Sequence, residues 1–215
     1  MENVITNYSV KDRKTLYNSF SKIEELTISD GEKETKREIL KTPDCVAAII
    51  FDTVKKKYIF VEQYRAGAEG VMVEVVAGSV DKGEKHEQAI KREIMEETGY
   101  KVDFTNHISD FYTSPGRTTE IISLFYCEVS ERVNKGGGIG DENISIVEVE
   151  KLGLNGRLFF DDPTGFNMEV GKESKMMPPY QLIDAKSLIA VMWFEKSNVL
   201  RDMAEVITQA KLRSL

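Results

Sequence analysis

The stretch GSVDKGEKHEQAIKREIMEETGY, residues 78–100, says more about the fold than any other part of the chain. Between residues 84 and 98 the β-branched character of the flanking segments disappears, and the apolar residues fall on one side at helical spacing. Gly99 is placed to end this helix as its C-terminal cap. The stretch therefore predicts a loop followed by a helix over residues 84–98.

Three glutamates crowd one side of this predicted helix. At about 100° per residue, Glu93 and Glu97 lie one turn apart on the same face, and Glu96 lies beside them. Like charges at this spacing cost about 0.2–0.5 kcal/mol each, unless hard divalent cations such as Mg²⁺ lie between them. Arg92, next to the cluster, can hold and orient a carboxylate with its guanidinium fork. A run of charges is otherwise a solvated helix face, so the alternatives are a phosphate-processing metal site and a polar surface.

The same segment resembles the Nudix box, in which glycine is followed after five residues by glutamate and after seven more by Arg-Glu-aliphatic-any-Glu-Glu-any-Gly-hydrophobic. The matching residues are Gly78, Glu84, Arg92, Glu93, Ile94, Glu96, Glu97 and Gly99. Tyr100 departs mildly, because the family usually has an aliphatic residue there. The resemblance implies a Nudix fold of the α+β class, an α/β/α sandwich with a mixed sheet between helices. It also implies metal-dependent hydrolysis of a nucleoside diphosphate linked to another moiety.

The resemblance also implies a role for individual residues. The implied metal ligands are Glu93 and Glu97 as the principal ones, Glu96 and Glu84 in support, and the backbone carbonyl of Ala77. The implied cofactor is Mg²⁺, with Mn²⁺ as an alternative, in two or three ions. Arg92 and Glu96 are expected among the catalytic residues, Arg92 by orienting the ligands.

Three segments outside the box resemble the ADP-ribose and GDP-mannose pyrophosphatases of this family. They are VEQYR (61–65), VEVVAGSVD (73–81) and YTSPGRTTE (112–120). The resemblance implies that Arg65 and Glu74 contact the substrate. Pro115 resembles the proline marker of the ADP-ribose pyrophosphatases, and Glu120 matches the acidic residue that ends that motif. Each segment is weak alone, because Pro-Gly is most often a turn, but their order and spacing favour the nucleotide-sugar branch.

A glycine-rich segment, NKGGGIGDENISIVEV at residues 134–149, ends in acidic residues before a strand pattern. Its composition alone is also that of a flexible linker. The segment is similar to the loop of bacterial GDP-mannose pyrophosphatase that carries the presumed general base. The implied base is Glu142, with Asp141 as second choice. A mobile loop would suit a base that swings over bound substrate.

The rest of the chain predicts strands at both sides of the helix. Residues 1–42 are expected to form a small antiparallel β appendage with a turn at residues 29–32, and residues 43–215 the Nudix domain. Further strands are expected at 45–52, 58–65, 71–80, 100–112, 118–131 and 144–152, and helices at 181–196 and 198–212. The stretch 154–181 is longer than the connection expected for the family. The segment LIDAKSLIAVMWF (182–194) resembles the opening of the family's C-terminal helix, with its apolar positions assigned to the core.

Composition and charge exclude several classes of protein. The 215 residues are 41% hydrophobic and 30% charged, which excludes disordered and collagen-like chains. A net charge of −7 disfavours nucleic acid and anionic membranes as partners. Cys45 and Cys127 each lie in an apolar run, so they are expected as buried free thiols. With no leader or apolar span in the sequence, a cytoplasmic location is expected.

Together these features predict Mg²⁺-dependent hydrolysis of a nucleoside diphosphate sugar, of the ADP-ribose or GDP-mannose class, to nucleoside monophosphate and sugar phosphate. The alternatives are a Nudix hydrolase of nucleoside triphosphates or capped RNA, and a non-catalytic nucleotide-sugar sensor. The resemblance also implies a homodimer in which the appendage crosses to the partner and completes its site. His86 and His107 have polar neighbours and no ligand spacing, and both are expected at the surface.

Overall fold

The computed structural model describes residues 7–19, 21–140, 142–153, 157–159, 180–182 and 184–197. Its elements are β1 (Ser9–Asn18), β2 (Lys22–Ser29), β3 (Glu34–Lys41), β4 (Cys45–Asp52), β5 (Lys57–Arg65), the 3₁₀ turn η1 (Ala66–Ala68), β6 (Gly70–Glu74), β7 (Val76–Ser79), α1 (His86–Thr98), β8 (Tyr100–Tyr112), β9 (Ile121–Arg132), β10 (Ser145–Val149), β11 (Lys151–Gly153), β12 (Arg157–Phe159) and β13 (Tyr180–Gln181). Residues 185–197 are also helical.

The main sheet is mixed and has the strand order β10-β5-β4-β9-β8. β4 and β9 run parallel, while the β8–β9, β4–β5 and β5–β10 pairs are antiparallel. β6 adds to β5 and β7 adds to β4. The short strands β11, β12 and β13 form a separate antiparallel sheet. The expected mixed sheet is therefore confirmed.

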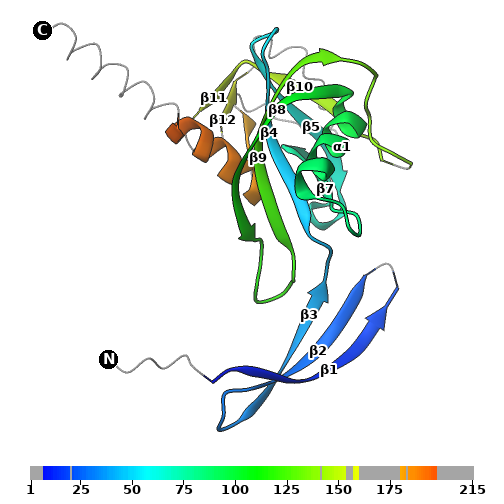
Figure 1. Cartoon of the computed structure of the whole chain (residues 1–215), viewed down its shortest axis with the longest axis vertical. Coiled ribbons are helices and arrows are strands. Elements are labelled where there is room, and N and C mark those ends of the chain that lie inside the picture. Colours follow the sequence, from blue (N-terminus) through cyan, green and yellow to red (C-terminus); the bar gives the residue numbers. More distant parts are fainter. Residues whose placement is uncertain are drawn as a thin grey trace, which may run out of the picture.

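Helices cover both faces of this sheet, as Figure 1 shows. α1 packs on one face through Ala89, Ile90 and Ile94, and the helix over 185–197 packs on the other through Ala190 and Val191. The central strand β4 is an apolar run because its alternating side chains enter the two cores in turn. The expected sandwich of a sheet between helices is confirmed.

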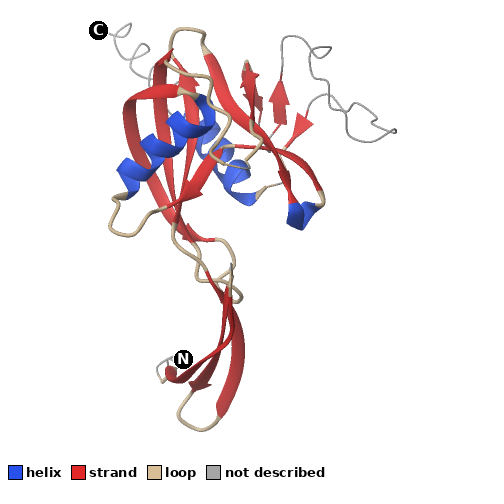
Figure 2. Cartoon of the chain, turned by 90° about the vertical axis from the view of Figure 1, so that its right-hand side faces the viewer, coloured by secondary structure: helices blue, strands red, loops and turns tan. Residues whose placement is uncertain are grey.

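The first three strands form an antiparallel sheet of their own. β2 and β3 are joined by a tight turn in which the Asp30 carboxylate accepts hydrogen bonds from the backbone N–H groups of Glu32 and Lys33. The sheet extends away from the main body (Figure 2). Backbone hydrogen bonds between Leu40 and the residues Arg117 and Thr119 fasten its end to the main body. The small antiparallel appendage is confirmed, while its division at residue 42 as a domain stays a prediction.

The strand expected at 71–80 is interrupted at Val75. β6 pairs with β5, whereas β7 pairs with β4. The Val75 N–H leaves the ladder and donates to Ser187 Oγ at 2.9 Å. The single-strand prediction was wrong because a residue 112 positions further along the chain provides a competing acceptor.

The ends of the helices also differ from the sequence-based expectation. α1 begins at His86 rather than Glu84, because the Glu84 carboxylate turns back to accept the Asp81 N–H at 3.1 Å. Its end is as predicted, with Gly99 at φ 73° donating its N–H to Met95 O. The helix expected at 181–196 spans 185–197, since residues 180–181 form β13. The helix expected at 198–212 lies outside the described residues.

The two histidines differ in their exposure to solvent, and so do the two cysteines. His86 is half-buried, with Nδ1 2.6 Å from Ser123 Oγ, so the surface prediction was wrong for it. His107 is exposed and contacts Asp110 at 2.8 Å. Both cysteines are free, and Cys127 is buried, as predicted. Cys45, the first residue of β4, is only half-buried, so the prediction of a buried thiol was wrong for it.

No helix in the described part of the chain is long and apolar enough to cross a membrane.

Candidate metal and phosphate site

Glu93 and Glu97 of α1 are unusually buried, and Glu93 lies against β7. Glu97 is 3% exposed, and its Oε2 has no hydrogen-bond partner. Only 12% of the Glu93 side chain is exposed. A Cβ added at Gly78 would lie 2.0 Å from Glu93 Cδ, so the glycine of β7 makes the space for this carboxylate. The helical spacing seen in the sequence therefore places two largely buried carboxylates one turn apart on α1.

Arg92 donates hydrogen bonds to three carboxylates of the cluster. Its Nε and Nη2 donate to the Glu84 carboxylate at 3.0 and 2.9 Å. Its Nη1 donates to Glu93 at 2.7 Å and to Glu96 at 3.1 Å. The hydrogen bonds that Arg92 donates to Glu84, and then to the other two acids, raise the pKa of Arg92 further above its usual range. One guanidinium thus orients three carboxylates, which is the arrangement expected of a residue that positions metal ligands.

Burial makes two of these carboxyl groups weaker acids than usual. Burial raises the pKa of Glu97 to about 8, and the charges of Glu93 and Glu142 act in the same direction while Arg65 opposes them. Burial also raises the pKa of Glu93, against the lowering effect of Arg92. Without a bound cation, the buried Glu97 therefore favours its protonated, neutral form at neutral pH, because burial disfavours the charged carboxylate.

The donor set suits a hard divalent cation. Among the described residues, no three Asp, Glu, His or Cys side chains already converge in a geometry that would hold a metal ion, since Arg92 takes up the oxygens of Glu84, Glu93 and Glu96. The buried, unpartnered Glu97 Oε2 is nevertheless the kind of oxygen that Mg²⁺ accepts. Ala77 precedes Gly78 on β7, so its backbone adjoins the glycine that makes space for Glu93. The residues present therefore fit a magnesium-type ion.

A second charged group adjoins the carboxylates. Arg65 donates to both oxygens of Glu74, from Nε at 2.9 Å and from Nη2 at 2.6 Å. Glu74 is 2% exposed, and Lys186 also donates to it, at 2.7 Å. Arg65 and Glu74 act on the pKa of Glu97, which places this group beside the α1 cluster.

Lys186 is a site residue that the sequence reasoning missed. Besides Glu74, it contacts Asp184 Oδ2 at 2.8 Å, and only 11% of its side chain is exposed. The signal was present in LIDAKSL, the segment that resembles the opening of the family's C-terminal helix. The apolar residues of this segment predict packing, and no local pattern indicates that Lys186 contacts Glu74, 112 positions away.

Pro115 and Glu120 belong to the loop between β8 and β9 rather than to the acidic cluster. Pro115 is exposed, and Glu120 is half-buried. The Glu120 carboxylate accepts a hydrogen bond from Thr113 Oγ1 at 2.7 Å and a longer one from Cys45 Sγ at 3.7 Å. These two contacts hold Glu120 between its own loop and the start of β4.

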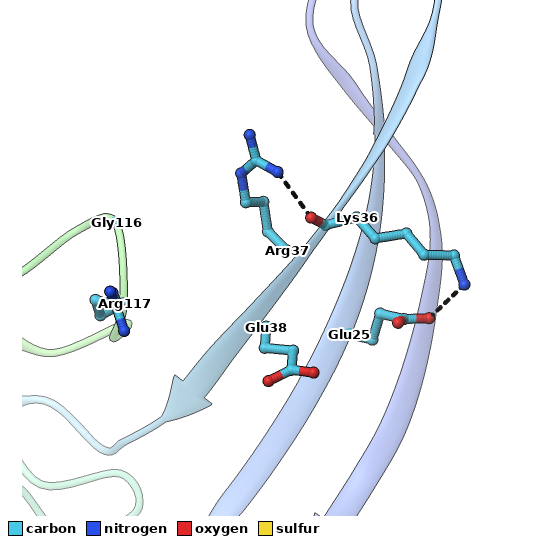
Figure 3. A pocket seen from close by; sticks show the side chains of 6 residues that line it. All are labelled: Glu25, Lys36, Arg37, Glu38, Gly116 and Arg117. Atoms are coloured by element: carbon cyan, nitrogen blue, oxygen red, sulfur yellow. Dashed lines mark hydrogen bonds and ion pairs between the residues drawn. The ribbon is translucent and has the colours of Figure 1, made fainter.

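This loop helps to line a cavity of about 500 Å³ between the appendage and the main body (Figure 3). The lining residues, which come from β2, β3 and the β8–β9 loop, are Glu25, Lys36, Arg37, Glu38, Gly116 and Arg117. Lys36 is paired with Glu25 at 2.7 Å. The mixture of cations and carboxylates suits a polar ligand with both anionic and hydrogen-bonding groups.

Glu142 approaches the cluster from the glycine-rich loop. It is exposed, and its Oε2 accepts the Ile139 N–H at 2.9 Å. Its charge contributes to raising the pKa values of both Glu93 and Glu97, after the larger effect of burial. Asp141, the second candidate for the base, lies outside the described residues. The Glu142 side chain lies against Gly138, whose N–H donates to Glu96 O, so the first candidate for the base lies near the carboxyl end of α1.

Comparison with known proteins points to one family. The NUDIX domain model matches residues 41–164. The chain is 36% identical over 134 residues to the GDP-mannose pyrophosphatase of Cronobacter sakazakii, covering 58% of this chain and 70% of that protein. It is 33% identical over 181 residues to the ADP-ribose pyrophosphatase of Bacillus subtilis, covering 83% and 86%. Among solved structures, an ADP compounds hydrolase matches with a TM-score of 0.57 at 18% identity, over 66% of this chain and 78% of that one, which bears on the fold alone.

Proposed function

Because this chain belongs to the NUDIX family, we propose that it hydrolyses the pyrophosphate bond of a nucleoside diphosphate sugar. The products are a nucleoside monophosphate and a sugar phosphate. The observation that carries the proposal is the buried carboxylate pair Glu93 and Glu97, with the unpartnered Glu97 Oε2, beside the cations Arg65 and Lys186. Relatives named for GDP-mannose and ADP-ribose support the substrate class.

The carboxylates of α1 are the proposed metal-binding groups. Mg²⁺, or Mn²⁺ in its place, would be held as two or three ions by Glu93 and Glu97, and when bound it neutralises phosphate charge and lowers the pKa of water. Glu84 and Glu96 would complete the set, together with the carbonyl oxygen of Ala77. Arg92 holds three of these carboxylates in register through its hydrogen bonds.

Glu142 is the proposed general base. Its carboxylate is exposed and close enough to act on the pKa values of Glu93 and Glu97. From this position it can accept the proton of the attacking water as the bond to phosphorus forms. Asp141 is the alternative base.

The cations beside the cluster are the proposed binding groups for the diphosphate. Arg65 and Lys186 are already oriented by the buried Glu74, so a phosphate oxygen would meet donors whose positions are fixed. Pro115 and Glu120 would contact the substrate farther from the pyrophosphate, through the loop that also lines the cavity of about 500 Å³.

Release of nucleoside monophosphate from ADP-ribose and from GDP-mannose, each with Mg²⁺, tests the proposal. Glu97→Gln is the variant expected to be inactive. Glu87→Gln is the matched control, because Glu87 lies on the same helix but is exposed and paired with Lys91. We expect turnover that Glu97→Gln loses and Glu87→Gln keeps. Turnover of nucleoside triphosphates or capped RNA instead would assign another Nudix activity. Binding of nucleotide sugars without turnover would indicate a sensor.

The appendage is the proposed dimer contact. Every residue of β1 is exposed, including the large apolar side chains of Val10, Leu16 and Tyr17, and so is Tyr8, just before the strand. Exposed apolar side chains on one strand are stabilised when a partner surface covers them, and a second copy of the chain would supply that surface. Light scattering at micromolar concentration should give the mass of a dimer. A monomer mass would contradict the proposal.

The proposed location is the cytoplasm. Cys45 and Cys127 are both free thiols, which suits a reducing compartment. Fractionation of cells that produce the protein would test this location.

A further inference from the structure

The carboxyl end of α1 has an uncommon set of hydrogen-bond partners. The last carbonyls of a helix have no partner within the helix and need donors from elsewhere. Here the donors come from one short segment, residues 132–138, which begins at the last residue of β9. The donor-to-acceptor pairs are Gly138 N to Glu96 O at 3.1 Å, Gly137 N to Glu97 O at 2.8 Å, Arg132 Nε to Thr98 O at 3.0 Å, and Val133 N to Gly99 O at 2.8 Å. We call this segment the glycine clamp.

The glycines of the clamp allow an approach that no other residue could make. Gly136 has φ +63°, and a Cβ there would lie 2.4 Å from Glu97 O. Gly138 has φ +84°, and a Cβ there would lie 2.6 Å from Glu142 Oε2. Both the positive φ and the close contacts exclude a side chain. Gly136 therefore serves close packing against α1, and Gly138 serves close packing against Glu142 and Ile144, where the sequence suggested mobility.

The clamp leads directly into the segment that carries Glu142. Ile144 N donates to Gly137 O at 3.3 Å, and the Ile144 side chain is buried in the core beneath α1. Between these residues, the Ile139 N–H holds Glu142 Oε2 at 2.9 Å. Both ends of the loop are thus fixed to α1 or to the core that α1 covers.

We propose that the glycine clamp positions Glu142 against Glu93 and Glu97, so that the base and the metal-binding carboxylates keep one relative geometry. Gly136 and Gly138 are positioning residues, and their lack of a side chain is the feature that matters. The inference rests on the proposed function for its catalytic consequence, while the clamp itself can be tested without turnover.

Two alanine variants isolate the contact from the backbone strain. Gly136→Ala and Gly140→Ala introduce a Cβ at nearly equal φ, +63° and +65°, but a Cβ at Gly140 meets nothing within 4 Å. Misplacement of a catalytic group by about 1 Å can lower the rate about 100-fold. We expect kcat to fall by about that factor in Gly136→Ala with KM little changed, and Gly140→Ala to stay near wild type. Equal kcat in the two variants would overturn the proposal.

Amide hydrogen exchange provides the measurement that does not depend on activity. The Gly137 and Gly138 amides should exchange slowly in the wild type and in Gly140→Ala, and faster in Gly136→Ala. Unprotected amides in the wild type would overturn the clamp. Absence of turnover in the wild type, with this exchange pattern intact, would overturn only the proposed function.

Gly138→Ala extends the test if Gly136→Ala does not fold. Its Cβ would collide with the Glu142 side chain, so the same loss of kcat is expected. Failure of both clamp variants to fold, beside a folded Gly140→Ala, would show that the clamp is needed for folding and would overturn its assignment as a positioning device.

Discussion

Replacing Glu97 with glutamine should make the unfolding free energy of the metal-free protein depend less on pH. The same substitution should abolish the activity of the protein with Mg²⁺. Burial raises the pKa of Glu97 from 4.5 to about 8, so the folded protein holds a proton that the unfolded chain releases between these values. The stability that this proton provides is complete below the unfolded pKa and is lost as pH rises through the folded pKa. Glutamine carries no charge at any pH, so this contribution disappears in the variant.

The size of the effect follows from the two pKa values. One pKa unit corresponds to about 1.4 kcal/mol, so the wild type should lose about 3 kcal/mol of unfolding free energy through Glu97 between about pH 5.5 and about pH 8.5. The pKa of Glu93 is also raised by burial, and it contributes in both proteins. The informative quantity is therefore the difference between the wild type and Glu97→Gln at each pH.

Urea unfolding in the presence of EDTA, followed at several pH values, measures this difference. Glu87→Gln is the control, because a hydrogen bond from Lys91 lowers the pKa of Glu87, which keeps its titration below the interval. The control should lose stability with pH as the wild type does. If Glu97→Gln also loses as much stability as the wild type, the argument that burial controls this carboxyl is refuted.

Three further predictions concern other parts of the molecule. Tyr100→Phe should lower the unfolding free energy by about 1–3 kcal/mol in urea unfolding, because the Tyr100 hydroxyl donates to the buried Asp52 carboxylate at 3.0 Å; an unchanged midpoint would contradict this. Lys186→Met should raise KM about tenfold or more in steady-state assays, since it removes a cation that Glu74 orients; an unchanged KM would place Lys186 outside the binding site. Adding Mg²⁺ to metal-free protein should raise the Tm of the wild type but not of Glu97→Gln, and equal shifts would place the ion elsewhere.

Local patterns account for what could be predicted about the site. The spacing of Glu93, Glu96 and Glu97 fixes them on one side of a helix, since helical geometry depends only on sequence separation. Gly99 ends the helix where expected, because its φ of 73° favours glycine. Arg92 meets its neighbours on the same helix for the same reason.

Contacts between distant segments explain what the sequence missed. Lys186 joins Glu74 across 112 positions, and no local pattern encodes such a pair. His86 was expected at the surface, but β9 presents Ser123 to its ring. The break at Val75 has the same origin, because its new acceptor belongs to the helix over 185–197.

The sequence by itself determined the family, the helix of the box and the acidic residues that it carries, because a spaced motif and a helical period are properties of neighbouring residues. Only the tertiary structure decided that Glu97 would be buried without a partner for Oε2, that Arg65 and Lys186 would meet on Glu74, and that three glycines would fasten the loop of Glu142 to α1. These features depend on desolvation and on hydrogen bonds between segments far apart in the chain, which exist only once the sheet and its two covering helices have assembled.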